Sequence, residues 1–105
     1  GKSEIQEEEV PMHVIVGMID KQFNQSVVKI RRGGTVAWRN EDIRPYFFII
    51  YYKNVYPNGD VQIEKTATRG INSGEEFSYT FEKTGEYKLL PIEHGRLRGL
   101  VQVVE

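Results

Sequence analysis

Short segments in which apolar and polar residues alternate follow one another along the chain. The clearest is 76–81, where three aromatic side chains are separated by polar ones. Alternation with a period of two is typical of a strand that buries one face. The same kind of pattern predicts further strands at 12–19, 27–30, 35–40, 46–52, 61–63, 87–90 and 99–104.

The segment 46–52 (YFFIIYY) is apolar on both faces, which predicts a strand with neighbours on both sides. Turn signals separate the predicted strands, with Gly33, Gly74 and the Pro57–Asp60 segment as the strongest. No stretch of a dozen residues shows a helical period. The pattern therefore predicts an all-β sandwich or barrel, with residues 1–9 as a flexible acidic tail and 10–105 as the domain.

The predicted first strand has two unlike faces. Four side chains point one way and form its apolar face, namely Met12, Val14, Val16 and Met18. His13, Ile15 and Ile19 point the other way. We interpret the two methionines as core residues. A thioether site for Cu(I) is less favoured, because the only nearby imidazole is on the opposite face.

Composition excludes several classes of function. The chain has 105 residues, enough for one domain, and a formal net charge of −1 that favours neither nucleic acid nor an anionic membrane as partner. No apolar run approaches the roughly 20 residues of a membrane-spanning helix, and residues 1–4 do not read as a secretory leader. The absence of cysteine excludes disulfides, thiolate metal ligands and thiol nucleophiles.

Two segments resemble the cupredoxins, the small blue-copper proteins that include amicyanin, plastocyanin and pseudoazurin. The first is Val28–Asn40 (VKIRRGGTVAWRN), followed by Pro45-Tyr46. It is similar to the family's glycine turn, Thr-Val-x-Trp-x-Asn strand and Pro-His pair. The second segment runs from Ser73 through Gly85-Glu86-Tyr87 into 91–99 (PIEHGRLRG), with the spacing of the amicyanin ligand loop. The resemblance implies a Greek-key β-sandwich and an exported or periplasmic location.

The chain departs from the family at the copper ligands. A type 1 site takes two imidazoles, one thiolate and a weak axial thioether. At the matching positions this chain has Tyr46, Pro91, His94 and Leu97, so His94 alone of the four family ligands remains. The resemblance thus implies the scaffold without its blue-copper centre, and the family's electron transfer does not carry over. We expect Tyr46, Pro91 and Leu97 to pack together and fill the former site.

A different metal site, for copper or zinc, would have to be built on His94. Glu93 and His13 are the candidate additional ligands, with Tyr46 across the loop. Strand alternation separates Glu93 from His94, and His13 has no counterpart among the family's ligands. Because a tight site needs three or four donors, we favour a domain without bound metal.

The remaining candidates indicate recognition rather than catalysis. Arg44, Arg96 and Arg98 are expected to gather at the loop end of the sandwich, where they could bind an acidic partner, and Arg69 could join them. Tyr56 is a further candidate surface residue. The sequence contains no recognisable catalytic triad and no phosphate-binding loop motif. We therefore predict a non-enzymatic binding or assembly module for a protein partner; the alternative is a metalloprotein built on His94.

Overall fold

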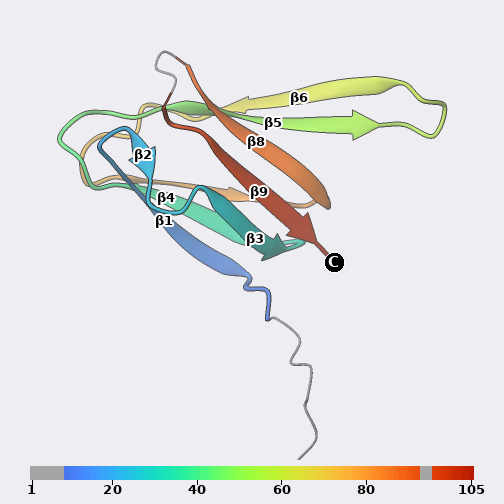
Figure 1. Cartoon of the computed structure of the whole chain (residues 1–105), viewed down its shortest axis with the longest axis horizontal. Coiled ribbons are helices and arrows are strands. Elements are labelled where there is room, and N and C mark those ends of the chain that lie inside the picture. Colours follow the sequence, from blue (N-terminus) through green and yellow to red (C-terminus); the bar gives the residue numbers. More distant parts are fainter. Residues whose placement is uncertain (1–8, 93–95) are drawn as a thin grey trace, which may run out of the picture.

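The computed structural model describes residues 9–92 and 96–105, and these residues contain nine strands in two sheets (Figure 1). The first sheet has the order β2-β1-β4-β7 and the second β3-β9-β8-β5-β6. The bounds are β1 His13–Ile19, β2 Gln22–Phe23, β3 Val27–Arg31, β4 Thr35–Asn40, β5 Phe48–Val55, β6 Val61–Ala67, β7 Glu76–Thr80, β8 Gly85–Pro91 and β9 Gly99–Val104. The described residues contain no helix that could cross a membrane.

Two parallel pairings connect strands that are distant in sequence. β1 pairs with β4 and β3 pairs with β9 in parallel, whereas the other pairs are antiparallel. The chain passes from β2 in the first sheet to β3 in the second and back to β4. This exchange between sheets makes the sandwich, and all the predicted strands are found in it.

The core lies between the sheets and is built on aromatic side chains. The Trp38 ring meets Phe48 edge-on with centroids 5.2 Å apart, and Phe48 meets Phe23 in the same way at 5.4 Å. Trp38 and Phe48 are fully buried. Edge-on aromatic pairs of this kind add about 1 kcal/mol each beyond the area that they bury.

Three details differ from the expectations. Met12 precedes β1 and is 42% exposed, so of the two methionines only Met18 is a core residue. β5 begins at Phe48 because Tyr46 makes an isolated bridge to Ile71 instead of joining the sheet. β6 extends to Ala67, four residues beyond the predicted strand.

β5 and β6 form a hairpin that extends past the rest of the second sheet (Figure 1). β8 accompanies β5 only as far as the Tyr52–Tyr87 pair, whereas the β5–β6 pairing continues to Val55–Val61. The part of the hairpin beyond Tyr52 thus has only two strands. β5 lies between β8 and β6, which confirms its prediction as an internal strand.

Candidate functional site

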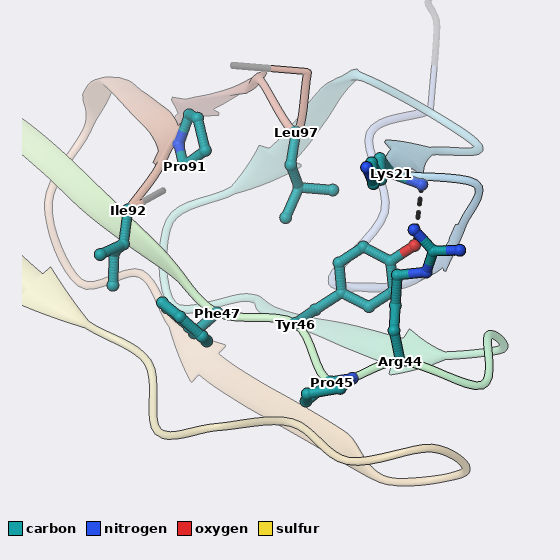
Figure 2. Close-up of a pocket in the computed structure, with 8 residues that line it drawn as sticks. All are labelled: Lys21, Arg44, Pro45, Tyr46, Phe47, Pro91, Ile92 and Leu97. Atoms are coloured by element: carbon teal, nitrogen blue, oxygen red, sulfur yellow. Dashed lines mark hydrogen bonds between the residues drawn. The ribbon is translucent and has the colours of Figure 1, made fainter. Parts of the chain in front are cut away.

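A pocket of about 290 Å³ opens at the loop end of the sandwich (Figure 2). It lies among the β1–β2 turn, the β4–β5 loop and the segment between β8 and β9. Its lining is mostly apolar but includes two cationic side chains. The lining residues are Lys21, Arg44, Pro45, Tyr46, Phe47, Pro91, Ile92 and Leu97. We call it the loop-end pocket. Its size is at the lower end for ligand sites, which suits one or two side chains better than a large cofactor.

The structure brings Tyr46, Pro91 and Leu97 to this one pocket. Tyr46 and Leu97 are 5% and 4% exposed, so both belong to the core as well as to the pocket wall. Pro91 ends β8 and pairs with Phe48 at the start of β5. All three side chains thus form parts of one pocket wall, but they do not fill this end of the sandwich completely, because the pocket remains between them.

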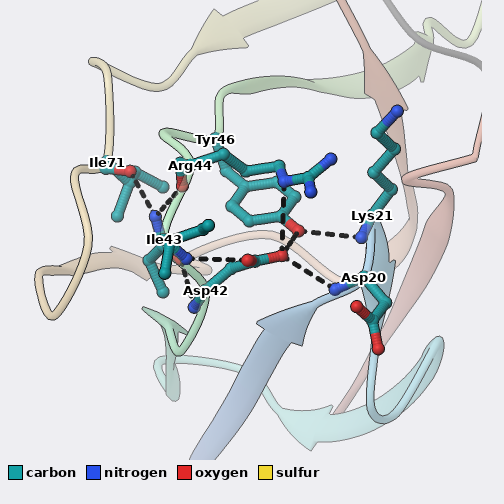
Figure 3. Close-up of polar contacts among 8 residues, drawn as sticks. Asp20, Lys21, Asp42, Ile43, Arg44, Tyr46 and Ile71 are labelled. Atoms are coloured by element: carbon teal, nitrogen blue, oxygen red, sulfur yellow. Dashed lines mark hydrogen bonds and ion pairs between the residues drawn. The ribbon is translucent and has the colours of Figure 1, made fainter.

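The Tyr46 hydroxyl connects two loops. Its Oη donates a hydrogen bond to Asp42 Oδ2 at 2.6 Å and accepts one from the Lys21 backbone N–H at 2.8 Å (Figure 3). The tyrosine is held in place by backbone hydrogen bonds in both directions between Tyr46 and Ile71, at 3.0 and 2.8 Å. The ring therefore fills the pocket wall while its hydroxyl fastens the β1–β2 turn to the β4–β5 loop.

Asp42 is the centre of this polar network. Besides the Tyr46 hydroxyl, its carboxylate accepts the backbone N–H groups of Asp20 at 2.9 Å and Ile43 at 2.7 Å. Arg44 Nε lies 3.6 Å from Oδ2. These hydrogen bonds, with that of Tyr46 the largest contribution, hold the pKa of the Asp42 carboxyl below its usual value.

The β1–β2 turn needs this support. Asp20 and Lys21 both have positive φ, 55° and 61°, in a region that residues with a side chain seldom adopt. Each such residue costs on the order of 1 kcal/mol, which the hydrogen bonds to Asp42 and Tyr46 offset. This turn places Lys21 at the pocket.

Asn40 fixes the other side of the network. It is 1% exposed, and its Nδ2 donates to the carbonyl oxygens of Arg44 at 2.7 Å and Ile71 at 2.8 Å. Its Oδ1 accepts the Asp42 N–H at 2.8 Å. With all three of these groups satisfied, a buried amide stabilises the loop instead of destabilising it.

The donor set of the described pocket does not fit a type 1 copper ion. The side chains of Pro91 and Leu97 have no atom that could coordinate a metal. The Tyr46 hydroxyl already donates a hydrogen bond to Asp42 and accepts one from the Lys21 N–H. Burial, followed by the hydrogen bond to Asp42, raises the pKa of Tyr46, so the phenol stays protonated at neutral pH and is a weak metal ligand. Within 9–92 and 96–105, no group of three or more His, Asp or Glu side chains could hold a metal ion.

The candidate ligands are not brought together among these residues. His13 is exposed at the start of β1, whereas the other end of that strand leads to the pocket, and its role as a helper ligand to His94 stays a prediction. Pairing of His13 with Thr35 places it beside the start of β4, the strand whose end leads to the pocket. Glu93 and His94 lie outside the described residues, and the expectations about them stay predictions.

The structure separates the expected partner-binding residues into two groups. Arg44 lines the pocket, and Arg96 and Arg98 flank Leu97 in sequence, with all three exposed. Tyr56 is 42% exposed but follows the opposite end of β5, so it belongs to the projecting hairpin and not to this site. Arg69 pairs with Glu75 at 3.6 Å and donates to the Glu76 carbonyl, away from the pocket lining.

Four residues line the pocket that were not predicted as site residues from the sequence: Lys21, Pro45, Phe47 and Ile92. Ile92 is 45% exposed, and Phe47 is half-buried beside it. The polar pair Asp20-Lys21, which lies between the apolar Ile19 and Phe23, could have predicted a turn at Lys21. Nothing local predicted that the turn would reach Tyr46, which is 25 residues further along the chain.

Comparison with solved structures identifies the scaffold. An oxidized amicyanin variant matches with a TM-score of 0.69 at 21% identity over 86% of this chain and 80% of that one. A reduced Cu(I) form of another amicyanin variant matches with a TM-score of 0.69 at 18% identity over 95% and 86%. A copper-containing nitrite reductase from Thermus scotoductus matches with a TM-score of 0.69 at 26% identity over all of this chain and 25% of that enzyme.

No protein-family model and no curated protein matches the chain. The fold is nevertheless clear from the structural matches: an all-β, cupredoxin-like Greek-key sandwich. The chain spans about a quarter of the nitrite reductase that it matches. With no cysteine anywhere in the sequence, it has no type 1 copper site.

Proposed function

We propose that this cupredoxin-like domain is a non-enzymatic binding module that docks a protein partner at the loop-end pocket. The observation that carries the proposal is the combination of an apolar pocket with cations at the end where the copper ligands are missing. Pro45, Phe47 and Ile92 offer apolar contact, and Lys21 and Arg44 provide positive charge beside it. Such a pocket suits an apolar side chain next to an acidic group of the partner.

The charges around the pocket support this assignment. Arg44 is already near Asp42, so its charge is partly balanced. Among the described residues no carboxylate forms an ion pair with Lys21. A cation at the rim of an apolar pocket attracts an acidic group and directs its approach, which gives a partner both orientation and specificity.

We further propose that the domain acts outside the cytoplasm, as the exported cupredoxins do, and that its binding requires no bound metal. Rigid support for the pocket comes from the polar network of Asp42 and Tyr46. This network uses the tyrosine hydroxyl to connect the loops, the role that a metal ion with ligands from several loops would otherwise have. Preorganisation of this kind reduces the entropy lost when a partner binds.

An apolar anion, 8-anilinonaphthalene-1-sulfonate, offers a direct first probe of the pocket. We expect its fluorescence to rise with the wild-type protein, and its affinity to fall about tenfold in Ile92→Glu, because the added carboxylate faces the sulfonate. Ile15→Glu is the matched control. Ile15 is 59% exposed on β1 and is not part of the pocket, so its replacement should leave the affinity unchanged.

The partner itself is tested by affinity capture with the same pair of variants. A protein retained by the wild type and by Ile15→Glu but lost with Ile92→Glu would support the proposal once direct binding is measured by calorimetry. Equal retention by all three proteins, or binding of the probe that is insensitive to Ile92→Glu, would contradict it.

A further inference from the structure

A second surface, independent of the loop-end pocket, lies on the outer face of β5, β6 and β8. The register places Tyr51 directly between Lys88 of β8 and Lys65 of β6. The Lys65 ammonium lies 5.8 Å from the centre of the Tyr51 ring. The neighbouring row on the hairpin pairs Lys53 with Ile63. We call this surface the lysine face.

The lysine face carries unbalanced charge. Elsewhere in the described part of the chain, cations have a carboxylate partner within 4 Å, among them Arg32, Arg39, Arg44, Arg69 and Lys83. No such ion pair is found among the described residues for Lys53, Lys65 or Lys88. Glu86 is the one acidic side chain in the lining of this surface. A chain with a net charge of −1 thus gathers three positive charges on one face of one sheet.

The same face also exposes apolar side chains on the projecting hairpin. Val55 and Val61 are paired opposite each other and are 59% and 51% exposed, and Ile63 is 48% exposed. Tyr51 and Leu90 complete the apolar part. Among the described residues no third strand flanks the hairpin beyond Tyr52, and a two-stranded ribbon alone is only marginally stable in water. A partner that covers them would stabilise the hairpin.

The shape of the face favours a protein segment over a membrane. The surface has an open depression of about 750 Å³ whose lining includes Tyr51, Ile63, Leu90, Glu86 and the three lysines. The hairpin ends in a polar turn at 57–60, where Asn58 and Asp60 hydrogen-bond to each other. A membrane-inserting hairpin would carry apolar residues at its tip.

We propose that the lysine face docks an acidic, extended segment of a protein partner whose carboxylates meet Lys53, Lys65 and Lys88 while its apolar side chains cover Tyr51 and Ile63. In an extended segment every second side chain points to the same side, so a segment with acidic and apolar residues at positions i, i+2 and i+4 presents both kinds to the lysine face. The charge complementarity identifies the chemistry of the partner.

The probe is a short fluorescein-labelled peptide in which glutamate and leucine take turns at every second position with serine between them, so that both kinds of side chain face the same way. It is titrated at about 0.15 M ionic strength. We expect saturable binding, with amide NMR shift changes centred on Tyr51, Lys65 and Lys88. Affinity should fall at least about tenfold in the double variant Lys65→Glu, Lys88→Glu. A peptide with glutamine in place of glutamate should bind no better than that variant.

The double variant Lys21→Glu, Arg96→Glu is the matched control. It changes the net charge equally but alters the loop end, so the peptide should bind it as it binds the wild type. Loss of binding in this control but not in the lysine variant would overturn the inference while leaving the loop-end proposal intact. Binding to phosphatidylserine vesicles without binding to the peptide, or self-association through this face in sedimentation, would also overturn it.

Discussion

At the scale of single residues, the hydroxyl of Tyr46 has a structural role that its aromatic ring alone could not fulfil. It satisfies the N–H of a strained turn and an oxygen of Asp42 at the same time. Removal of this hydroxyl would leave the Lys21 N–H without its acceptor and would take one of two hydrogen-bond donors from Asp42 Oδ2, which keeps the Asp20 N–H. The position therefore contributes both to the pocket wall and to the stability of two loops.

We expect Tyr46→Phe to lower the free energy of unfolding by about 2 kcal/mol in urea denaturation. The variant loses the charge-assisted hydrogen bond to Asp42 and the acceptor of the Lys21 N–H. Tyr56→Phe is the control. The Tyr56 hydroxyl bonds to Gln62 on the exposed hairpin, and its loss should change stability by less than about 0.5 kcal/mol. Similar losses in both variants would contradict a special role for Tyr46.

Asp42 predicts an acid dependence of stability. Its hydrogen bonds, above all that from Tyr46, lower the pKa of the folded-state carboxyl. This contribution is therefore fully present above the unfolded-state pKa of about 3.9 and is lost as the pH falls through the lower folded-state pKa. We expect the stability difference between wild type and Asp42→Asn to be constant near neutral pH and to shrink below about pH 4.

Urea denaturation across this pH range measures the difference. Tyr46→Phe provides an internal check, because this variant removes the largest cause of the lowered pKa and should weaken the acid dependence. A difference between wild type and Asp42→Asn that does not change with pH would mean that the carboxylate is not held in this network.

Local sequence could identify the candidates for this site but not their connections. Tyr46, Pro91 and Leu97 could be singled out because they stand at spaced positions of a recognisable loop pattern. The link between Tyr46 and the Lys21 N–H depends on a tertiary contact between distant segments. The role of Met12 was wrong for a related reason: a period of two gives the face of a residue, but not where the strand and the opposite sheet end.

At the scale of elements, alternation predicted the strands well because most of them bury only one face. β7 and β3 follow this rule, with their inner residues less exposed than their outer ones. β2 was missed because it has two residues, too few for any period. The length of β6 was underestimated because the apolar alternation ends at Ile63, whereas the charged Glu64 and Lys65 continue the pairing with Tyr52 and Tyr51.

The start of β8 depends on Gly85, which has a φ of 130°. A Cβ there would lie 3.0 Å from Tyr52 Cε1, and the Tyr52 ring stacks on Tyr87 with centroids 4.4 Å apart. We expect Gly85→Ala to lower the free energy of unfolding by about 1–2 kcal/mol, through backbone strain and displacement of this stack.

Thermal unfolding monitored by circular dichroism measures this loss. Gly70→Ala is the matched control, since Gly70 has no positive φ and an added Cβ meets nothing within 4 Å. The control should change stability by less than about 0.5 kcal/mol. If the two substitutions have equal effects, the Tyr52–Tyr87 stack does not constrain the start of β8.

At the scale of the whole molecule, the sandwich keeps a cupredoxin-like architecture while its loop end has different chemistry. A fold can persist when its site changes, because the core and the loops are stabilised by different contacts. Here the core depends on Trp38 and Phe48, whereas the loops depend on Asn40, Asp42 and Tyr46. The projecting hairpin could not be predicted, because its length depends on where β8 stops pairing.

We predict that a copper centre can be restored at the loop end. The triple change Tyr46→His, Pro91→Cys, Leu97→Met should supply a thiolate, an imidazole and a thioether to join His94. We expect the folded variant to develop an intense visible thiolate-to-copper band with Cu(II). A variant that folds and stays colourless would show that the positions of the loop are not those of the family's ligands.

The most direct test of the central claim is a metal titration of the chelator-treated wild-type protein. Cu(II), Cu(I) and Zn(II) are added in turn, with calorimetric and elemental readout. We predict only weak, non-stoichiometric association, unchanged in His94→Ala, because the loop end is organised by the Asp42–Tyr46 network and apolar packing. A stoichiometric site of micromolar or tighter affinity that disappears in His94→Ala would contradict the account and make the domain a metalloprotein.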